Sequence, residues 1–311
     1  MTSPAPLYAL VGPTAVGKTD VSIDLAKKLG AEIIGCDSMQ VYRQMPVLTQ
    51  QPTAKQRASV PHHVVDYVDP SEFYSAGRYR RDALAAIADL QQRGKRILLV
   101  GGTGLYLKAL ADGLCDAPAV PAEIRERLWR AIEQHGNEAM HQRLQTIDPA
   151  AASAIHPNNA RRIVRALEVY ESTGRRLSAF WQAGGRDRVA IRAVAVTRDR
   201  TELYDRIHRR IDEMLEREGV LDEARRVMDL PLSRSAQQVH GLRFLAGFLR
   251  GELTREAMLE GWRQQVRNYA KRQLTWFRAQ PHVRWLVAGS KDSSSIIATE
   301  ALRLLEAADV S

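Results

Sequence analysis

The residues with the clearest chemistry form the run Gly12-Pro13-Thr14-Ala15-Val16-Gly17-Lys18-Thr19. This run fits the pattern G-x-x-x-x-G-K-[ST], in which glycines let the backbone curl so that several N–H groups point toward a phosphate. The N-terminus of the following helix adds partial positive charge. Lys18 adds a full charge, and the Thr19 hydroxyl is a candidate Mg²⁺ ligand. The pattern predicts a diphosphate or polyphosphate site, and taken alone it favours a nucleoside triphosphatase or a kinase.

Two other polar segments directly follow short apolar runs. Asp37 comes after Glu32-Ile33-Ile34-Gly35, and Gly101-Gly102-Thr103 comes after Arg96-Ile97-Leu98-Leu99-Val100. In an open parallel sheet the carboxyl ends of the strands line the ligand crevice, so Asp37 and Thr103 should face the same cleft as Lys18. A carboxylate there binds Mg²⁺ or acts as a general base, and a helix N-cap is the alternative for Asp37. Thr103 and its glycines are a second candidate phosphate contact.

The segments that must position these residues alternate between strand and helix patterns. Residues 7–11, 32–35, 63–68 and 96–100 are predicted strands, and residues 18–29 and 78–92 are predicted helices. This alternation indicates an α/β fold with a parallel sheet flanked by helices.

The pattern changes after about residue 117, where Pro118 and Pro121 indicate a boundary. Residues 122–177 have a helical pattern with breaks near 147–149 and 156–157. A strand pattern returns at 189–196, followed by helices over 202–228, 238–250 and 255–279 and a strand over 283–287. We therefore expect a core domain of residues 1–117 and 190–311, interrupted by an all-helical domain of residues 118–189.

The net charge of +9 is unevenly distributed along the chain. Residues 151–290 contain 26 Lys and Arg against 16 Asp and Glu, whereas residues 1–150 contain 17 against 16. Nearly all of the excess is arginine, which suits bidentate phosphate contacts and stacking on bases. A polyanion, nucleic acid first, is the predicted partner. A solvated helical surface is the alternative.

The composition excludes several classes of protein. There are two cysteines, Cys36 and Cys115, which are too few for a disulfide framework. No stretch approaches the ~18 apolar residues that span a bilayer, and no secretory signal is visible. We expect a cytoplasmic protein without a membrane partner.

Seven motifs in this order resemble the bacterial tRNA dimethylallyltransferase family, also called tRNA isopentenyltransferases. They are GPTAVGKT, DSMQVY, PHHVVD, SAGRYRRDA, VGGTGLYLKAL, HPNNARRIVRALEV and RNYAKRQLTWFR. The resemblance implies a P-loop NTPase-like core with a helical insertion. It also implies transfer of a dimethylallyl group from dimethylallyl diphosphate to the exocyclic amine of the adenine 3′ of the anticodon, with Mg²⁺ assisting. The protein is expected to be a monomer.

The resemblance also implies roles for individual residues. Asp37 would be the general base, Thr103 would lie near the reacting centre, and residues 12–19 would hold the diphosphate with Thr19 as metal ligand. Arg210, or else Arg206, would contact the diphosphate.

The residues that this resemblance implies for tRNA contact lie in several segments. They are Asp37, Ser38, Met39, Gln40, Thr103, Arg125, Arg161, Arg162, Ile163, Val164, Arg165, Gln238, Arg243, Arg267, Lys271 and Arg272. Phe180 and Trp181 either stack on RNA or pack the insertion.

The sequence departs from the family pattern at two places. Leu48-Thr49-Gln50-Gln51-Pro52 stands where the family carries Gly-Thr-Ala-Lys-Pro, and Val239-His240-Gly241-Leu242-Arg243 stands where it carries an Ile-Gly-Tyr-Arg-like segment. A P-loop small-molecule kinase, an AMP prenyltransferase and a non-catalytic RNA-binding protein are the alternative functions. The kinase and the AMP enzyme leave the basic half of the chain unexplained.

Overall fold

The computed structural model describes residues 6–114, 118, 120–182 and 188–307. The chain forms two compact units, one of residues 1–111 with 189–311 and one of residues 112–188. Cys115, one of the two cysteines considered above, lies outside the described residues. Within the described part, no helix is both long enough and apolar enough to cross a membrane.

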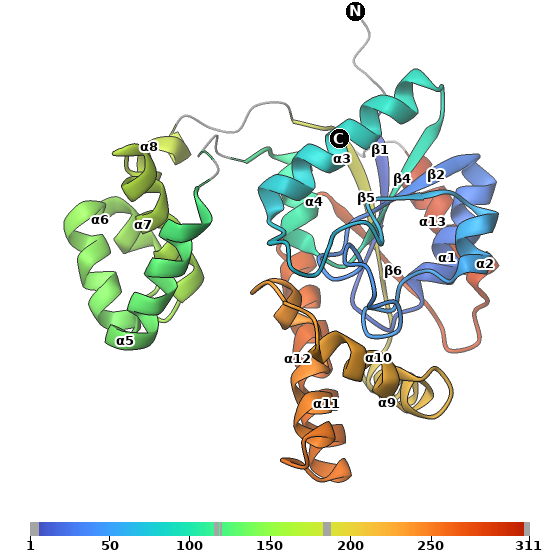
Figure 1. Ribbon diagram of the computed structural model, residues 1–311. Helices are drawn as coiled ribbons and strands as arrows, with labels where there is room; N and C mark the ends of the chain where they lie inside the picture. The colour runs from blue at the N-terminus through green and yellow to red at the C-terminus, as the bar shows by residue number, and fades with distance from the viewer. Residues whose placement is uncertain (1–5, 115–117, 119, 183–187, 308–311) are drawn as a thin grey trace, which may run out of the picture. The chain divides into compact units, whose positions relative to one another are not determined.

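A six-stranded sheet forms the centre of the first unit (Figure 1). Its strand order is β3-β2-β4-β1-β5-β6, and every neighbouring pair is parallel. The strands are β1 (Leu7–Val11), β2 (Ala31–Gly35), β3 (His62–His63), β4 (Arg96–Gly101), β5 (Ile191–Thr197) and β6 (Val283–Val287). The predicted parallel α/β fold is confirmed.

Helices cover both faces of this sheet. In Figure 1, α1 and α13 pack together on one face, and α3 and α4 pack together on the other. The helices of this unit are α1 (Lys18–Leu29), α2 (Ala54–Ser59), α3 (Ala76–Gln92), α4 (Gly104–Ala111), α9 (Arg200–Glu216), α10 (Val220–Met228), α11 (Leu242–Leu249), α12 (Arg255–Arg278) and α13 (Ser294–Glu306), with a 3₁₀ turn at Ala236–Gln238. Because helices shield both faces, the central strands are apolar throughout, as Leu10, Ile34 and Leu98 show by their full burial.

The second unit is helical in its described residues. It comprises α5 (Ala122–Ile147), α6 (Pro149–Ala154), α7 (Ala160–Thr173) and α8 (Leu177–Gln182). The helices enclose a core of their own that includes Leu128, Leu144 and Leu167. Asp148 links α6 to α8. Its carboxylate caps α6 at the Ala151 N–H and accepts hydrogen bonds from Ser178 of α8.

Two predicted elements were wrong in extent. The strand expected over residues 63–68 ends at His63, because Val64 and Asp66 have φ angles of 60° and 57° and so leave the extended region. The helix expected over residues 202–228 is divided into α9 and α10 by a break at residues 217–219, where Gly219 has a left-handed φ of 69°.

Close backbone contact brings the ends of the central strands together. A Cβ on Gly101 would overlap the carbonyl oxygen of Cys36, and a Cβ on Gly12 would overlap that of Val196. The second residue after β4 and the first residue after β2 are also joined directly, since the Thr103 N–H donates to the Cys36 carbonyl over 3.1 Å. The absence of a side chain at these two positions therefore lets the neighbouring strand ends approach each other this closely.

Gly101→Ala should lower the free energy of unfolding by about 1–3 kcal/mol, because the added methyl group has no space beside the Cys36 carbonyl. Urea unfolding followed by circular dichroism measures this. Gly77→Ala in the first turn of α3 is the matched control, since its Cβ would meet only the Ser75 hydroxyl at 3.8 Å. Equal stability of Gly101→Ala and wild type would show that the strand ends are not closely packed.

Candidate active site

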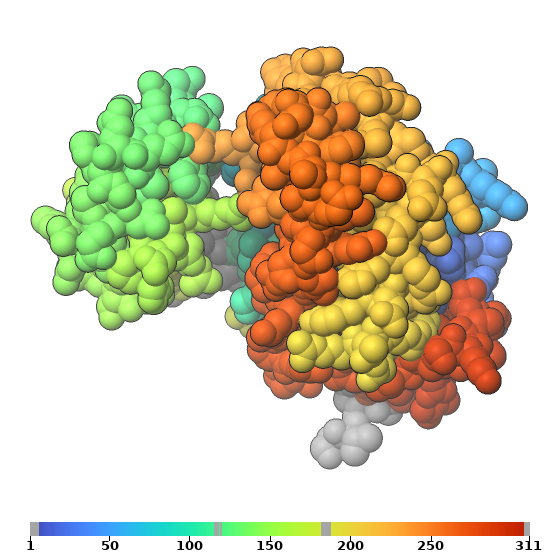
Figure 2. All heavy atoms as spheres, turned by 90° about the horizontal axis from the view of Figure 1, so that it is seen from below, coloured from blue at the N-terminus to red at the C-terminus, as the bar shows by residue number. Residues whose placement is uncertain are grey.

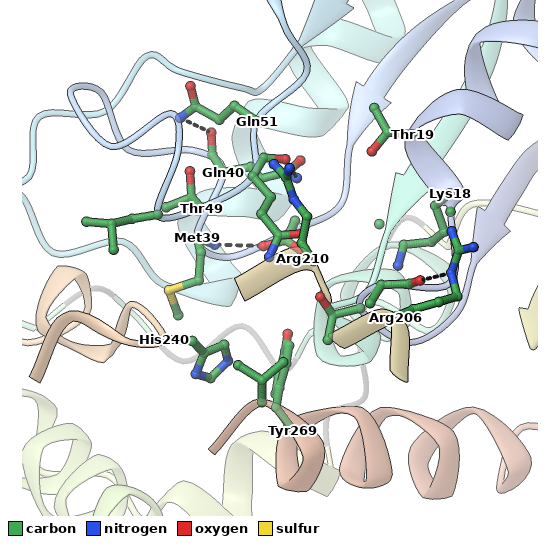
Figure 3. A pocket seen from close by; sticks show the side chains of 18 of the residues that line it. Lys18, Thr19, Met39, Gln40, Thr49, Gln51, Arg206, Arg210, His240 and Tyr269 are labelled. Carbon is green, nitrogen blue, oxygen red and sulfur yellow. Dashed lines mark hydrogen bonds between the residues drawn. The ribbon is translucent and has the colours of Figure 1, made fainter. Parts of the chain in front are cut away.

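A cavity of about 490 Å³ lies where the carboxyl ends of β1, β2 and β4 meet helices α9 and α12. Figure 3 shows its lining, with Lys18 and Arg206 at one side and Met39, Gln40, Thr49 and Gln51 at the other. All of its walls belong to the first unit. Its remaining residues are Thr14, Ala15, Gly17, Thr19, Asp20, Asp37, Leu48, Gln50, Thr53, Gln56, Val100, Gly101, Arg209, Arg210, Glu213, Glu218, His240, Trp262, Val266, Tyr269 and Gln273.

Positively charged side chains hold the carbonyl oxygens of the P-loop. Lys18 Nζ donates to the Gly12 carbonyl over 2.9 Å and to that of Pro13 over 2.6 Å. Arg206 Nε donates to the Ala15 carbonyl over 2.8 Å, and Arg198 Nε donates to the Val16 carbonyl over 3.0 Å. These contacts fix the conformation of the loop, whose peptide N–H groups other than that of Thr14 are the candidates for phosphate binding.

Burial decides the protonation of the Lys18 ammonium. Removal from water lowers its pKa to about 8, and the Asp37 carboxylate opposes this shift. Lys18 is therefore mostly protonated at neutral pH, but with a small margin. A phosphate would favour the charged form further.

Asp37 and Thr103 lie on two loops that are joined by hydrogen bonds. The Thr103 hydroxyl accepts from the Ser38 N–H over 3.0 Å, and the Asp37 carboxylate accepts from the Met39 N–H over 2.9 Å. No helix follows Asp37, so the N-cap alternative is wrong. Cys36 beside it is buried, as expected of a small apolar residue, and burial raises its thiol pKa to about 12.

Gln273 of α12 joins the P-loop to the turn after β4. Its Oε1 accepts from the Thr14 N–H, its Nε2 donates to the Gly102 carbonyl, and both distances are 2.9 Å. Sequence reasoning did not single out this residue. The sequence does contain a sign of its role. Gln273 is a polar residue on a face of α12 whose other residues, Trp262, Val266 and Phe277, are apolar and buried.

Tyr269 lies one helical turn before Gln273 and also faces the cavity (Figure 3). Burial raises its phenol pKa, and the Asp37 carboxylate raises it further. The phenol is therefore neutral, and it can donate a hydrogen bond near Asp37.

The loop of residues 43–51 is held by polar side chains. Gln51 Nε2 donates to the Tyr42 carbonyl over 2.7 Å, and Gln40 Nε2 donates to the Gln50 carbonyl over 2.8 Å. From α10, the buried Glu223 carboxylate accepts from the N–H groups of Val47 and Leu48 over 3.0 and 2.7 Å. The residues of this departure from Leu48 to Gln51 line the cavity, and Glu223 holds the backbone of the same loop from outside the cavity lining.

The two arginines considered for diphosphate contact lie differently. Arg206 touches the P-loop through the Ala15 carbonyl, and its guanidinium lies beside Gly17. Arg210, the preferred residue, lines the cavity but is paired with Glu218 and Glu213. The geometry thus favours Arg206 over Arg210.

Several residues expected to contact tRNA lie in the helical unit. Ile163 and Val164 are buried in its core, so their side chains have no surface to offer RNA, whereas Arg161 and Arg162 are exposed. Arg125 and Arg165 both bind the buried carboxylate of Glu168 over 2.8 Å. A buried carboxylate needs such partners, which gives these two arginines a structural role.

The two aromatic residues of α8, Phe180 and Trp181, differ in burial. Phe180 is buried with the Arg175 guanidinium over its ring, so it packs the unit. Trp181 is 41% exposed.

The remaining residues expected to contact tRNA lie on the helices that cover one face of the first unit (Figure 2, yellow to orange). Gln238, Arg243, Lys271 and Arg272 are exposed. Arg267 is paired with Glu260 over 2.7 Å.

Oxygen ligands for a divalent cation are present beside the P-loop. The cavity lining includes the Thr19 hydroxyl and the carboxylates of Asp20 and Asp37. Among the described residues, no group of three or more His, Cys, Asp or Glu is arranged to hold a metal ion. The donors fit Mg²⁺, which binds through few protein oxygens and completes its shell with phosphates and water.

The fold and the site define a P-loop protein whose loop borders a cavity that also contains a carboxylate. The family model described as IPP transferase matches residues 40–280, and the chain belongs to this family.

Relatives and solved structures agree with this assignment. The chain is 42% identical to tRNA dimethylallyltransferase 2 of Syntrophus aciditrophicus, with 92% of this chain and 93% of that protein covered. It is also 42% identical to tRNA dimethylallyltransferase of Thermotoga petrophila, over 88% and 90% of the two chains. The crystal structure of the full-length tRNA isopentenylpyrophosphate transferase of Bacillus halodurans matches with a TM-score of 0.68 and 38% identity, over 97% of each chain. A eukaryotic dimethylallyltransferase acting on tRNA matches with a TM-score of 0.79 and 28% identity, over 95% of this chain and 77% of that one.

Relative to that of Lys18→Arg, the affinity of wild type for inorganic diphosphate should be constant below about pH 8 and should fall above it, by up to about tenfold per pH unit. The reason is that the anion binds the protonated form of Lys18, whose pKa in the free protein is about 8. Calorimetric titrations from pH 6.5 to 9.5 measure this. Lys18→Arg keeps its charge throughout, so subtracting its profile removes the titration of the diphosphate itself. Parallel profiles for the two proteins would contradict the prediction.

Proposed function

We propose that this protein transfers a dimethylallyl group from dimethylallyl diphosphate to the exocyclic amine of the adenine 3′ of the anticodon in tRNA. The observation that carries the proposal is that Lys18 and Asp37 line one cavity together with residues of α9 and α12, while the Thr103 hydroxyl binds the Ser38 N–H next to Asp37. Family membership and the tRNA dimethylallyltransferases among its relatives support it.

On the donor side, the P-loop N–H groups, Lys18 and Arg206 would bind the diphosphate. Negative charge grows on the bridging oxygen as its bond to the allylic carbon breaks, and fixed donors in a buried site stabilise that charge where it develops. A Mg²⁺ ion bound through the Thr19 hydroxyl would supply further positive charge to the phosphate oxygens.

On the acceptor side, Asp37 would act as general base. The adenine amine nitrogen forms a bond to the allylic carbon, the carbon–oxygen bond breaks, and diphosphate leaves with the electron pair. The amine is a weak nucleophile because its lone pair is delocalised into the ring. Transfer of its proton to Asp37 keeps positive charge from building up on the nitrogen. Thr103, which holds the Ser38 N–H, would position this loop.

Exposed cations on both units would bind the anticodon stem-loop. Arg161 and Arg162 belong to the helical unit, and Arg243, Lys271 and Arg272 belong to α11 and α12. The target base must leave its stack to reach a cavity, and unpaired loop bases are the cheapest to extrude.

One assay separates this function from its alternatives. The protein is incubated with Mg²⁺ and labelled dimethylallyl diphosphate together with tRNA or AMP, and separately with ATP. Label on tRNA alone supports the proposal, and label on AMP would support a free-nucleotide prenyltransferase. Turnover of ATP without label transfer would support a kinase or an ATPase, and RNA binding without any turnover would support a non-catalytic binding protein.

Asp37→Asn should lower the rate of prenyl transfer about 10²–10⁴-fold, because the amide cannot accept the proton. Affinity for tRNA should change little, since the amide oxygen still accepts from the Met39 N–H. Single-turnover rates and filter binding measure the two quantities. Asp89→Asn, at the exposed end of α3, is the control. A near-normal rate in Asp37→Asn would remove Asp37 from this role.

Replacing both Lys271 and Arg272 by alanine should weaken tRNA binding and flatten its salt dependence. Each lost phosphate contact should reduce the slope of log K against log salt by about 0.7–0.9. The control is the double variant Lys27→Ala and Lys28→Ala, which removes the same amount of charge from α1. If both double variants change the slope equally, the effect comes from net charge and α12 is not an RNA contact.

A further inference from the structure

His240 presents an unsatisfied imidazole to the cavity. The residue lies between the 3₁₀ turn and α11, and its ring is beside that of Tyr269 with centroids 4.2 Å apart (Figure 3). Both ring nitrogens are buried, and neither has a hydrogen-bond partner in the described part of the chain. Buried polar atoms in native proteins nearly always have partners, so these nitrogens, which face the cavity, are available to water or to a bound ligand.

The chain holds His240 rigidly in this position. Val239 on one side is buried in the core. Gly241 on the other packs so closely against Trp262 that a Cβ would overlap the indole, and its N–H donates to Gln265 over 2.9 Å. A residue whose neighbours are fixed in this way has a defined geometry toward a ligand.

The chemistry of the ring restricts what the ligand offers. Burial, together with the nearby Arg272, lowers the pKa of His240 to about 4, so the ring is neutral at physiological pH. A neutral imidazole has one N–H donor and one nitrogen acceptor. A prenyl chain offers neither a donor nor an acceptor, and a diphosphate offers only acceptors. A base edge or a ribose hydroxyl offers both.

The position of the ring also separates it from the phosphate site. His240 lies against Tyr269, whose phenol is affected by the Asp37 carboxylate, and it lies near Met39 in Figure 3. Lys18 and Arg206 are at the other side of the cavity. The Asp37 carboxylate affects the pKa values of both Tyr269 and Lys18, so the proposed general base is within reach of both sides of the cavity.

On the basis of the proposed function, we propose that His240 is a binding residue for the acceptor RNA, forming hydrogen bonds to a base edge or a ribose hydroxyl at the target nucleotide. The residue stands in the segment where this sequence departs from the Ile-Gly-Tyr-Arg-like pattern, so the contact would distinguish this chain from members that carry isoleucine there.

The test compares wild type with His240→Ile and His240→Gln in prenyl transfer to an anticodon stem-loop RNA. His240→Ile should lower kcat/KM for the RNA about 3- to 10-fold, as loss of one or two neutral hydrogen bonds predicts. KM for dimethylallyl diphosphate should stay within twofold of wild type. His240→Gln, whose amide also has a donor and an acceptor, should recover part of the loss. His282→Ile, at an exposed position, is the matched control and should behave as wild type.

Thermal unfolding of the free protein supplies a second readout. Replacing unsatisfied buried nitrogens by an apolar side chain should leave Tm unchanged or raise it. A lower Tm without rescue by His240→Gln would show a structural role and overturn the proposal. A changed KM for the donor with an unchanged kcat/KM for RNA would place His240 at the prenyl chain and would also overturn it. If wild type transfers the prenyl group and His240→Ile does so equally well, only the proposal for His240 fails. If wild type transfers nothing to RNA, the proposed function itself fails.

Discussion

The binding of the P-loop carbonyls by cationic side chains is the interaction on which the site depends. A loop presents its N–H groups to a phosphate only if its carbonyl oxygens find other donors, and here Lys18, Arg198 and Arg206 supply them. Both arginines come from the segment after β5, and Arg198 also donates to the Gly289 carbonyl over 2.8 Å. The P-loop near the N-terminus, our proposed phosphate site, is therefore held by residues about 190 positions later in the chain.

Helix α12 connects the two halves of the proposed reaction. One face carries Tyr269 and Gln273, which line the cavity, and Gln273 binds both the P-loop and the turn after β4. The exposed side chains of Lys271 and Arg272 lie on another face of the same helix. Because a helix is a stiff element, its cations would hold a bound RNA at a fixed place relative to the P-loop.

Some of the buried polar residues of the first unit hold the segments that surround the cavity. Glu223 holds the loop of residues 43–51 through two backbone N–H groups, and burial raises its pKa, so its charge is maintained at a cost in desolvation. His240 is the extreme case, because its nitrogens have no partner in the described chain. Such exceptions to core packing are expected where a ligand completes the hydrogen bonding.

The sequence by itself determined the parallel sheet, the P-loop, the convergence of Asp37 and Thr103 at one edge and the family, because these depend on local patterns and on strand direction alone. It did not determine that residues 64–68 leave the strand, that Ile163 and Val164 face a core, or that Arg206 reaches the loop where Arg210 pairs with Glu218. Helical spacing shows which residues share a face, but only packing decides what lies opposite that face. The roles of Gln273, Glu223 and His240 were decided by the tertiary structure for this reason, since each depends on a partner, or on the lack of one, far away in the sequence.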